Sequence, residues 1–290
     1  MLVIEFGFPA GRYHATPWGH NVNEGIVEWP PSPYRLARAL IDVGRRRRPG
    51  WSDERLAAVV KALEKPVGFR LPPATASHTR SYLSSNKKDP TKKQKVFDSF
   101  VTVDRKQRLV AAFGTEVPAE IREDLDGLLR EINYFGRSES WVRARVVGDE
   151  NAELNCLPAD RTEERLGHDV VNLACLRPEG EYEALEHKPT AGKPRKNKPA
   201  QALSWIEALS MSTDDLLREG WSTPPSQKMV PYLRKASALR PRPRRRRRAL
   251  ESRFTAAEYA IHTTVLPRVT DTVPFAEKIH RKLMGIHKRV

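Results

Sequence analysis

Residues 11–38 read GRYHATPWGHNVNEGIVEWPPSPYRLAR, and this stretch separates a predicted strand from a predicted helix. Apolar residues occupy every second position from Leu2 to Phe8, which indicates the strand. Ser32 is a favourable N-cap and Pro33 suits the first position of the helix. The connection over residues 9–31 is much longer than the usual ~4–6 residues, and its Trp and Tyr content argues against disorder. We therefore expect an ordered, functional loop.

The chain is basic. Its 290 residues include 51 Lys and Arg against 36 Asp and Glu, a formal net charge of +15. This excess predicts a polyanionic partner, with nucleic acid ahead of an anionic membrane surface. We expect a cytoplasmic protein with no membrane partner, because no stretch approaches the ~20 apolar residues of a span and the N-terminus does not resemble a signal peptide. No metal site or cofactor is expected, since the two cysteines lack metal-ligand spacing and no nucleotide-binding motif occurs.

Periodicity in the first 150 residues predicts the order strand, helix pair, strand, hairpin, helix, strand. This order fits an α+β fold, a ferredoxin-like or RRM-like sheet with long insertions. The hairpin is expected to join residues 96–103 to residues 108–113. A basic, thumb-like loop is expected before it, at residues 77–95.

Three regions are expected along the chain. Residues 1–150 would form an RRM-like RNA-binding domain, and residues 151–250 an irregular or helical extension that contains a strand near 229–233 and a basic linker. Helices are expected at 200–211 and 213–219 within this extension. Residues 251–290 read as a strand followed by an amphipathic helix. Such a pair either packs back on the first sheet or begins a truncated second RRM-like domain.

Three segments together supply the mixture that single-strand RNA binders use, with cations for phosphates and rings for bases. They are the opening loop, residues 77–95 and the Arg-Pro tract at 240–248. One charge run alone usually marks a solvated face, but three runs with aromatic residues nearby favour RNA binding. The candidate RNA-binding residues are Arg12, Tyr13, His14, Trp18, His20, Asn21, Asn23, Trp29, Arg35, Arg38, Arg80, Lys87, Lys88, Lys92, Lys93, Lys95, Arg137, Trp141, Arg244, Arg245 and Arg246.

Metal-independent RNA cleavage is an alternative to binding alone. It needs a general base near a ribose 2′-OH and an acid near the leaving oxygen, and His serves both roles near neutral pH. The candidates are His14, His20, His262 and His280, although these residues could equally bind RNA or face solvent. A third alternative is a scaffold that contacts only protein.

Several segments carry a resemblance to a known family. Residues 11–38, the run VFDSFVTV at 96–103 and the run YFGRSESWV at 134–142 resemble the fused "family five plus family six" CRISPR-associated subunits of type I-U (I-G) systems. The Arg-Pro tract and residues 266–272 also resemble that family. The resemblance covers most of the chain apart from about 150–225.

This resemblance implies an RRM-like fold with an RNA-binding thumb, placed at the 5′ handle of a guide RNA in a surveillance complex. The implied partners are the guide (CRISPR) RNA, the backbone and large subunits, and target DNA indirectly. The second half of the fusion resembles a repeat-cleaving endoribonuclease, but its His-rich strand motif is absent from this chain. We therefore expect a handle-capping RNA-binding subunit, with endoribonuclease as the alternative.

Overall fold

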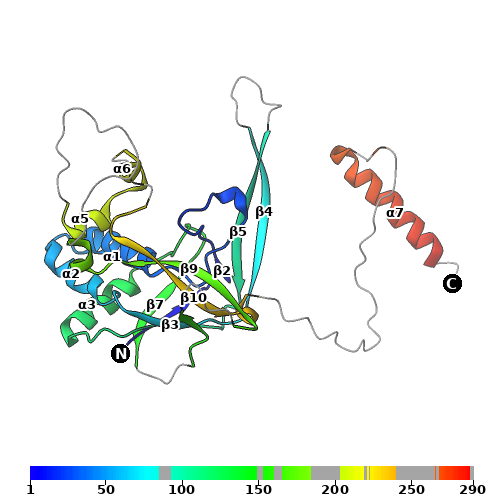
Figure 1. The fold of residues 1–290 in the computed structure, drawn as a ribbon. Helices are drawn as coiled ribbons and strands as arrows, with labels where there is room; N and C mark the ends of the chain where they lie inside the picture. The colour runs from blue at the N-terminus through cyan, green and yellow to red at the C-terminus, as the bar shows by residue number, and fades with distance from the viewer. Residues whose placement is uncertain are drawn as a thin grey trace. The chain divides into compact units, whose positions relative to one another are not determined.

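The computed structural model describes residues 1–84, 93–148, 153–159, 165–183, 203–218, 221, 223–239, 265 and 268–287. The chain forms two compact units, Met1–Pro243 and Arg244–Val290. Figure 1 shows the course of the chain through its helices and strands. Within the described ranges, no helix is long and apolar enough to cross a membrane.

The first unit contains the predicted βαββαβ order. Its four strands form one antiparallel sheet in the spatial order β7-β1-β6-β3. Numbered along the chain, this order is 4-1-3-2, the arrangement of ferredoxin-like and RRM-like sheets. The predicted α+β, RRM-like fold is confirmed. The strands are β1 (Leu2–Gly7), β3 (Pro66–Arg70), β6 (Leu109–Phe113) and β7 (Arg143–Val147).

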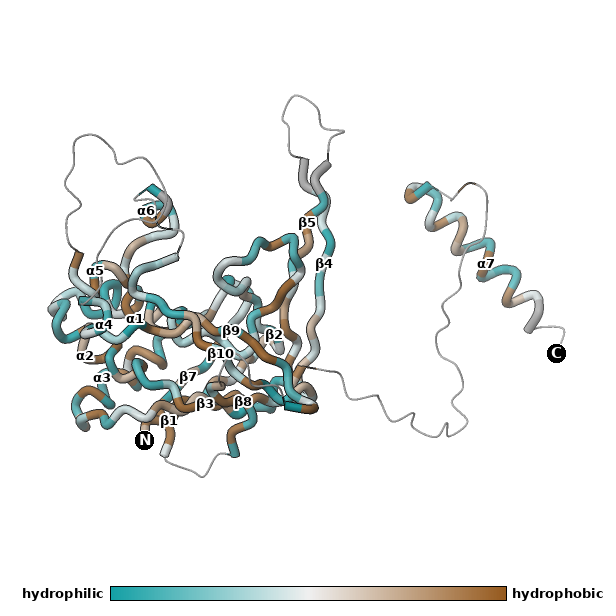
Figure 2. The backbone as a smooth tube through the Cα atoms, in the orientation of Figure 1, coloured by the Kyte–Doolittle hydropathy of each residue, from teal (hydrophilic) through white to brown (hydrophobic). Residues whose placement is uncertain are grey.

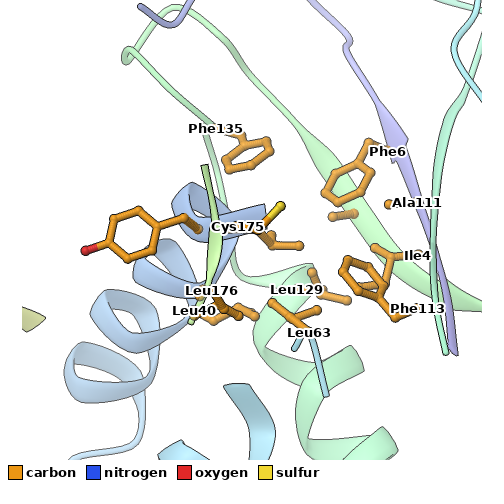
Figure 3. Close-up of a cluster of buried hydrophobic side chains, with 14 of the residues drawn as sticks. Ile4, Phe6, Leu40, Leu63, Ala111, Phe113, Leu129, Phe135, Cys175 and Leu176 are labelled. Atoms are coloured by element: carbon orange, nitrogen blue, oxygen red, sulfur yellow. The ribbon is translucent and has the colours of Figure 1, made fainter. Parts of the chain in front are cut away.

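Three helices pack on this sheet: α1 (Pro33–Arg47), α2 (Asp53–Lys61) and α3 (Ala119–Arg130). The Ser32 hydroxyl accepts a hydrogen bond from the Arg35 amide, as its predicted N-cap role requires. The core lies between the helices and the sheet. Figure 3 shows Ile4, Phe6 and Phe113 from the sheet near Leu40 and Leu129 from the helices.

Three more strands extend the sheet beyond β3, in the order β3-β8-β10-β9. They are β8 (Cys156–Pro158), β9 (His168–Leu176) and β10 (Gln227–Lys235). The sequence pattern predicts part of β10 but not β8 or β9. In β9 the four residues 173–176 are all buried, so the strand lacks the period of two by which half-buried strands are detected.

A second sheet has the order β2-β5-β4 and consists of β2 (Arg12–Tyr13), β4 (Ala74–Ser84) and β5 (Lys93–Val103). We call the hairpin of β4 and β5 the arm; Figure 1 shows it projecting from the body of the first unit. The predicted hairpin of residues 96–103 with 108–113 is wrong. β5 pairs with β4 and β2, whereas β6 pairs with β1 and β3.

The predicted loop at 77–95 is also wrong for its described residues, because 77–84 and 93–95 are strand. The outer part of β4 alternates between polar residues of different kinds and has no apolar face, so periodicity did not reveal it. Figure 2 shows this part of β4 as hydrophilic.

The remaining elements are short, apart from the last helix. The first unit adds η1 (Val22–Glu24), α4 (Glu179–Glu183), α5 (Trp205–Ser210), α6 (Thr213–Arg218) and η2 (Ala236–Ala238). The second unit contains η3 (Val269–Asp271) and α7 (Thr272–His287). The helices expected from sequence at α5, α6 and α7 are confirmed. The strand expected in the first part of residues 251–290 and the basic linker fall almost entirely outside the described residues.

The two cysteines test the placement of β8 and β9. Cys156 and Cys175 are free and buried, and burial raises the pKa of each thiol to about 12. Both should therefore remain protonated and inaccessible near neutral pH. We expect neither to react with DTNB in the native protein, and both to react after denaturation in guanidinium. Rapid labelling of the native protein would contradict these strand positions.

Candidate nucleic-acid interface

The opening loop, residues 9–31, is closed by the buried carboxylate of Glu28, which is 4% exposed. This carboxylate accepts hydrogen bonds from the Tyr13 hydroxyl at 2.5 Å and the Ser32 amide at 3.0 Å. Arg35 donates two more, from Nε and Nη2, both at 2.9 Å. Nη2 of Arg35 also donates to the Thr16 carbonyl at 2.9 Å. One carboxylate thus joins the start and end of the loop to the first turn of α1.

The charges in this cluster stabilise one another. Burial and the neighbouring Glu28 raise the pKa of Tyr13 well above its usual value, so the phenol stays a donor. Burial disfavours the charged form of Arg35, but Glu28 outweighs that effect and raises the pKa of Arg35. Charge-assisted, bidentate contacts of this kind are stronger than neutral hydrogen bonds. Arg35, predicted to bind RNA, is thus held in an internal ion pair.

Two aromatic residues predicted to bind RNA belong to the core instead. Tyr13 is 0% exposed and Trp29 is 1% exposed. Their rings pack against each other at 6.0 Å and against Phe8 at 5.5 and 6.3 Å. This burial counts against the predicted RNA contacts of Tyr13 and Trp29, because neither ring has a surface to offer a base. Trp18 is partly buried and also packs against this core.

His14 is similarly enclosed, with 3% of its surface exposed. Its Nδ1 lies 2.5 Å from Oε1 of Glu139, and its Nε2 is buried with no hydrogen-bond partner. A general base must come within hydrogen-bonding reach of the proton that it removes. In this conformation His14 cannot reach a ribose, which counts against His14 as a catalytic or RNA-binding residue.

The tip of the loop is exposed and lies against the arm. The Phe97 amide donates to the Asn23 side-chain oxygen at 3.2 Å, which joins η1 to the edge of β5. His20 and Asn21 are exposed beside it. Nδ1 of His20 lies 2.6 Å from Oε2 of Glu24, and this hydrogen bond lowers the pKa of Glu24. An ionised carboxylate therefore orients the His20 ring.

Two further predicted residues contact the base of the arm. The Arg12 guanidinium lies 4.1 Å from the centre of the Phe100 ring, a cation–π contact. Nη1 of Arg137 donates to Asp98 at 2.9 Å, and the Arg137 amide donates to the His14 carbonyl at 2.9 Å. The opening loop, the base of the arm and the segment after α3 therefore form one connected region.

The arm places cations and rings on one face. Antiparallel pairing sets Arg80 opposite Phe97 and Tyr82 opposite Lys95. Because side chains alternate between faces along a strand, His78 shares this face. The Phe97 ring centre lies 4.5 Å from Lys95 Nζ, 5.4 Å from Arg80 Cζ and 5.9 Å from the His78 ring. We call these five residues the basic–aromatic face.

Arg80 and Lys95 are among the RNA-binding residues predicted from the sequence, whereas His78, Tyr82 and Phe97 are not. Tyr82 is 63% exposed, and alternate positions along a polar hairpin would have identified all three. Two other predicted residues of the first unit lie on other elements: Arg38 is half-buried on α1, and Trp141 is exposed after α3. His280 lies on α7 of the second unit. Lys87, Lys88, Lys92, Arg244, Arg245, Arg246 and His262, together with the Lys93 side chain, lie outside the described residues.

Comparison with known proteins adds little to this geometry. No family model matches the sequence, and no curated protein matches it. A crystal structure of a CRISPR protein from Archaeoglobus fulgidus is 14% identical, covers 62% of this chain and 80% of that chain, and has a TM-score of 0.27. At this level of likeness, function has to be inferred from the residues themselves. Among the described residues, no group of three or more His, Cys, Asp or Glu is arranged to hold a metal ion.

Replacing Glu28 tests the closure of the loop. We expect Glu28→Ala to lower the free energy of unfolding by about 3 kcal/mol, because it leaves the Arg35 charge without its partner. Tyr13→Phe keeps the ring and loses one hydrogen bond to a charged group, so its cost should be smaller, about 1.5 kcal/mol. Guanidinium denaturation measures both. The exposed Glu123→Ala is the control, and a Glu28→Ala loss no larger than the control's would contradict the account.

Proposed function

We propose that this protein is the RNA-binding subunit of a type I CRISPR surveillance complex that caps the 5′ handle of the guide RNA. The observation that carries RNA binding is the basic–aromatic face of the arm. The resemblance of residues 11–38 to the fused CRISPR subunits supports the identity of the RNA and of the complex. Backbone and large subunits would be the neighbouring chains, and target DNA would be met indirectly.

The chemistry of this face suits single-stranded RNA. Arg80 and Lys95 offer charges to phosphates, while Tyr82 and Phe97 offer ring surface to bases. Stacking needs unpaired bases, since the bases in a duplex already stack on one another. Stacking on a ring contributes about 1–3 kcal/mol per base and tolerates any sequence.

The opening loop extends the same surface. Asn23 lies at the edge of β5 through its contact with Phe97, and the exposed Asn21 and His20 stand beside it. Amide side chains both donate and accept hydrogen bonds, so they suit the edges of unpaired bases. In this proposal the arm holds the strand, and the tip of the loop contacts the bases beside it.

Salt dependence tests the phosphate contacts. With about 6 contacts to single-stranded RNA, the logarithm of the binding constant should fall with the logarithm of salt concentration at a slope of about −4. Fluorescence anisotropy at several salt concentrations measures this slope. An affinity independent of salt would contradict binding through phosphates.

Substitution of Phe97 tests the stacking contacts. Phe97→Ala should weaken RNA binding by about tenfold, because it removes a ring on which a base stacks. Phe97→Tyr keeps a ring and should bind normally. Arg130→Ala, an exposed cation on α3 that pairs with Asp126, serves as the control for charge loss elsewhere. Equal affinities for the Phe97→Ala variant and the unmodified protein would contradict the assignment of this face.

Of the two candidates in the opening loop, the endoribonuclease alternative favours His20. Its ring is exposed and oriented by Glu24, so it could come within hydrogen-bonding reach of a ribose, whereas His14 is enclosed. The capping proposal expects the full chain to bind repeat RNA in EDTA without cutting it. Specific cleavage that is lost in His20→Ala and retained in His280→Ala would instead establish the enzyme. If the chain does not bind RNA at all, the protein-only scaffold is favoured.

A further inference from the structure

A groove of about 450 Å³ lies along α1 and contains none of the arm's residues. Side chains of α1 between Arg35 and Arg47 form one wall. Residues 131–136, which follow α3, complete the lining together with Leu209, Ser210 and Ser212 at the end of α5. Its volume falls within the ~300–1,000 Å³ range of small-ligand sites, so it has room for a short segment of a polymer.

The lining of the groove is strongly cationic. It contains five arginines and two acids: Arg35, Arg38, Arg45, Arg46 and Arg47 against Asp42 and Glu131.

Three of these arginines form ion pairs at the surface. Arg45 pairs with Asp53, Arg46 with Asp42 and Arg47 with Glu131. Exposed pairs contribute about 0–1 kcal/mol, so an incoming phosphate can displace them at little cost.

Arg38 is the one arginine of the groove outside the last turn of α1 that has no carboxylate partner among the described residues. Arginines in the last turn of a helix are explained by the helix dipole alone, which accounts for Arg45, Arg46 and Arg47. Arg38 lies in the second turn of α1, where the dipole gives no such reason. Among the described residues no carboxylate pairs with Arg38; its Nη1 makes a 3.5 Å contact with the Tyr34 hydroxyl. A half-buried cation without a counter-charge favours an anionic ligand.

Exposed rings stand beside these cations. Tyr134 lines the groove and is 46% exposed, and Trp141, directly opposite it in an isolated β-bridge, is 61% exposed. An acidic protein segment would need the arginines but not the rings. Cations with exposed aromatic rings are instead the combination that holds single-stranded nucleic acid.

The segment that carries Tyr134 also connects the groove to the arm. Arg137 contacts Asp98 on β5 and the His14 carbonyl, as described above. Gly136 has φ +96°, and a Cβ there would lie 2.4 Å from the His14 carbonyl oxygen, so only glycine permits this approach. Residues 134–137 therefore connect the groove directly to the base of the arm, and these contacts fix their position.

We propose that the α1 groove is a second contact site for the same single-stranded RNA that the arm binds, with a phosphate at Arg38 and a base stacked on Tyr134. This inference rests on the proposed function, because it takes RNA as the ligand of the arm. It assigns the strand a course from the basic–aromatic face past Arg137 into the groove.

The test uses the full chain and single-stranded RNA of about 16 nucleotides, the upper end of the length that one single-strand site covers. Tyr134→Ala should weaken RNA binding at least about fivefold, whereas Tyr134→Phe keeps the ring and should bind RNA normally. Arg38→Ala should reduce the salt slope by about 0.7, the value of one lost phosphate contact. Arg145→Ala, an exposed cation on β7 outside the groove, should change neither the affinity nor the slope.

Each result decides between the two proposals. Normal affinity and slope in the Tyr134 and Arg38 variants, with weakened binding in Phe97→Ala, would overturn the groove and leave the arm. Normal binding in all three variants would overturn both. Polyglutamate serves as the competing probe: if it binds through Arg38 regardless of Tyr134, while RNA ignores both residues, the groove is an acidic-protein site and the RNA proposal for it fails.

Discussion

The buried carboxylate of Glu28 is the contact on which the shape of the opening loop depends. A loop spanning residues 9–31 loses much conformational entropy on folding, and Glu28 offsets that loss by joining Tyr13, Ser32 and Arg35. Because Tyr13 belongs to β2, the same contact holds β2 against β5. The base of the arm is therefore linked to the first turn of α1.

The stability of the arm depends on how its base is anchored. A two-stranded hairpin is marginal in water unless one end is anchored, and here the buried Ala74, Val101 and Val103 provide that anchor. Beyond them the arm has no core to fill. Lysines are common on exposed strands because they prevent edge-to-edge association, which would explain Lys95. The same reasoning does not explain an exposed Tyr82 beside Phe97, and these rings are what favour a nucleic-acid ligand.

Local patterns predicted those parts of the fold in which one side of an element faces the core. β1, α1 and α3 were found this way, and Ser32 caps α1 as its sequence position indicates. Strand pairing was not predictable, because residues 96–103 and 108–113 are adjacent in sequence yet lie in different sheets. Which strands pair depends on contacts distant in the sequence.

The candidate site was predicted only in part, because the role of a side chain also depends on contacts distant in the sequence. A Tyr or Trp in a long polar loop can pack the loop or stack on a base, and a single sequence does not distinguish the two. Tyr13 and Trp29 pack the loop. Glu28 was not singled out because buried carboxylates are rare, whereas Arg80 and Lys95 were found from charge alone.

The central claim is that the arm's basic–aromatic face contacts RNA. Photo-cross-linking of the full chain to single-stranded RNA containing 4-thiouridine, followed by peptide mapping, tests it most directly. The account predicts cross-links within β4 and β5, at Tyr82 or Phe97. Cross-links confined to segments other than β4 and β5, with both strands unlabelled, would contradict it.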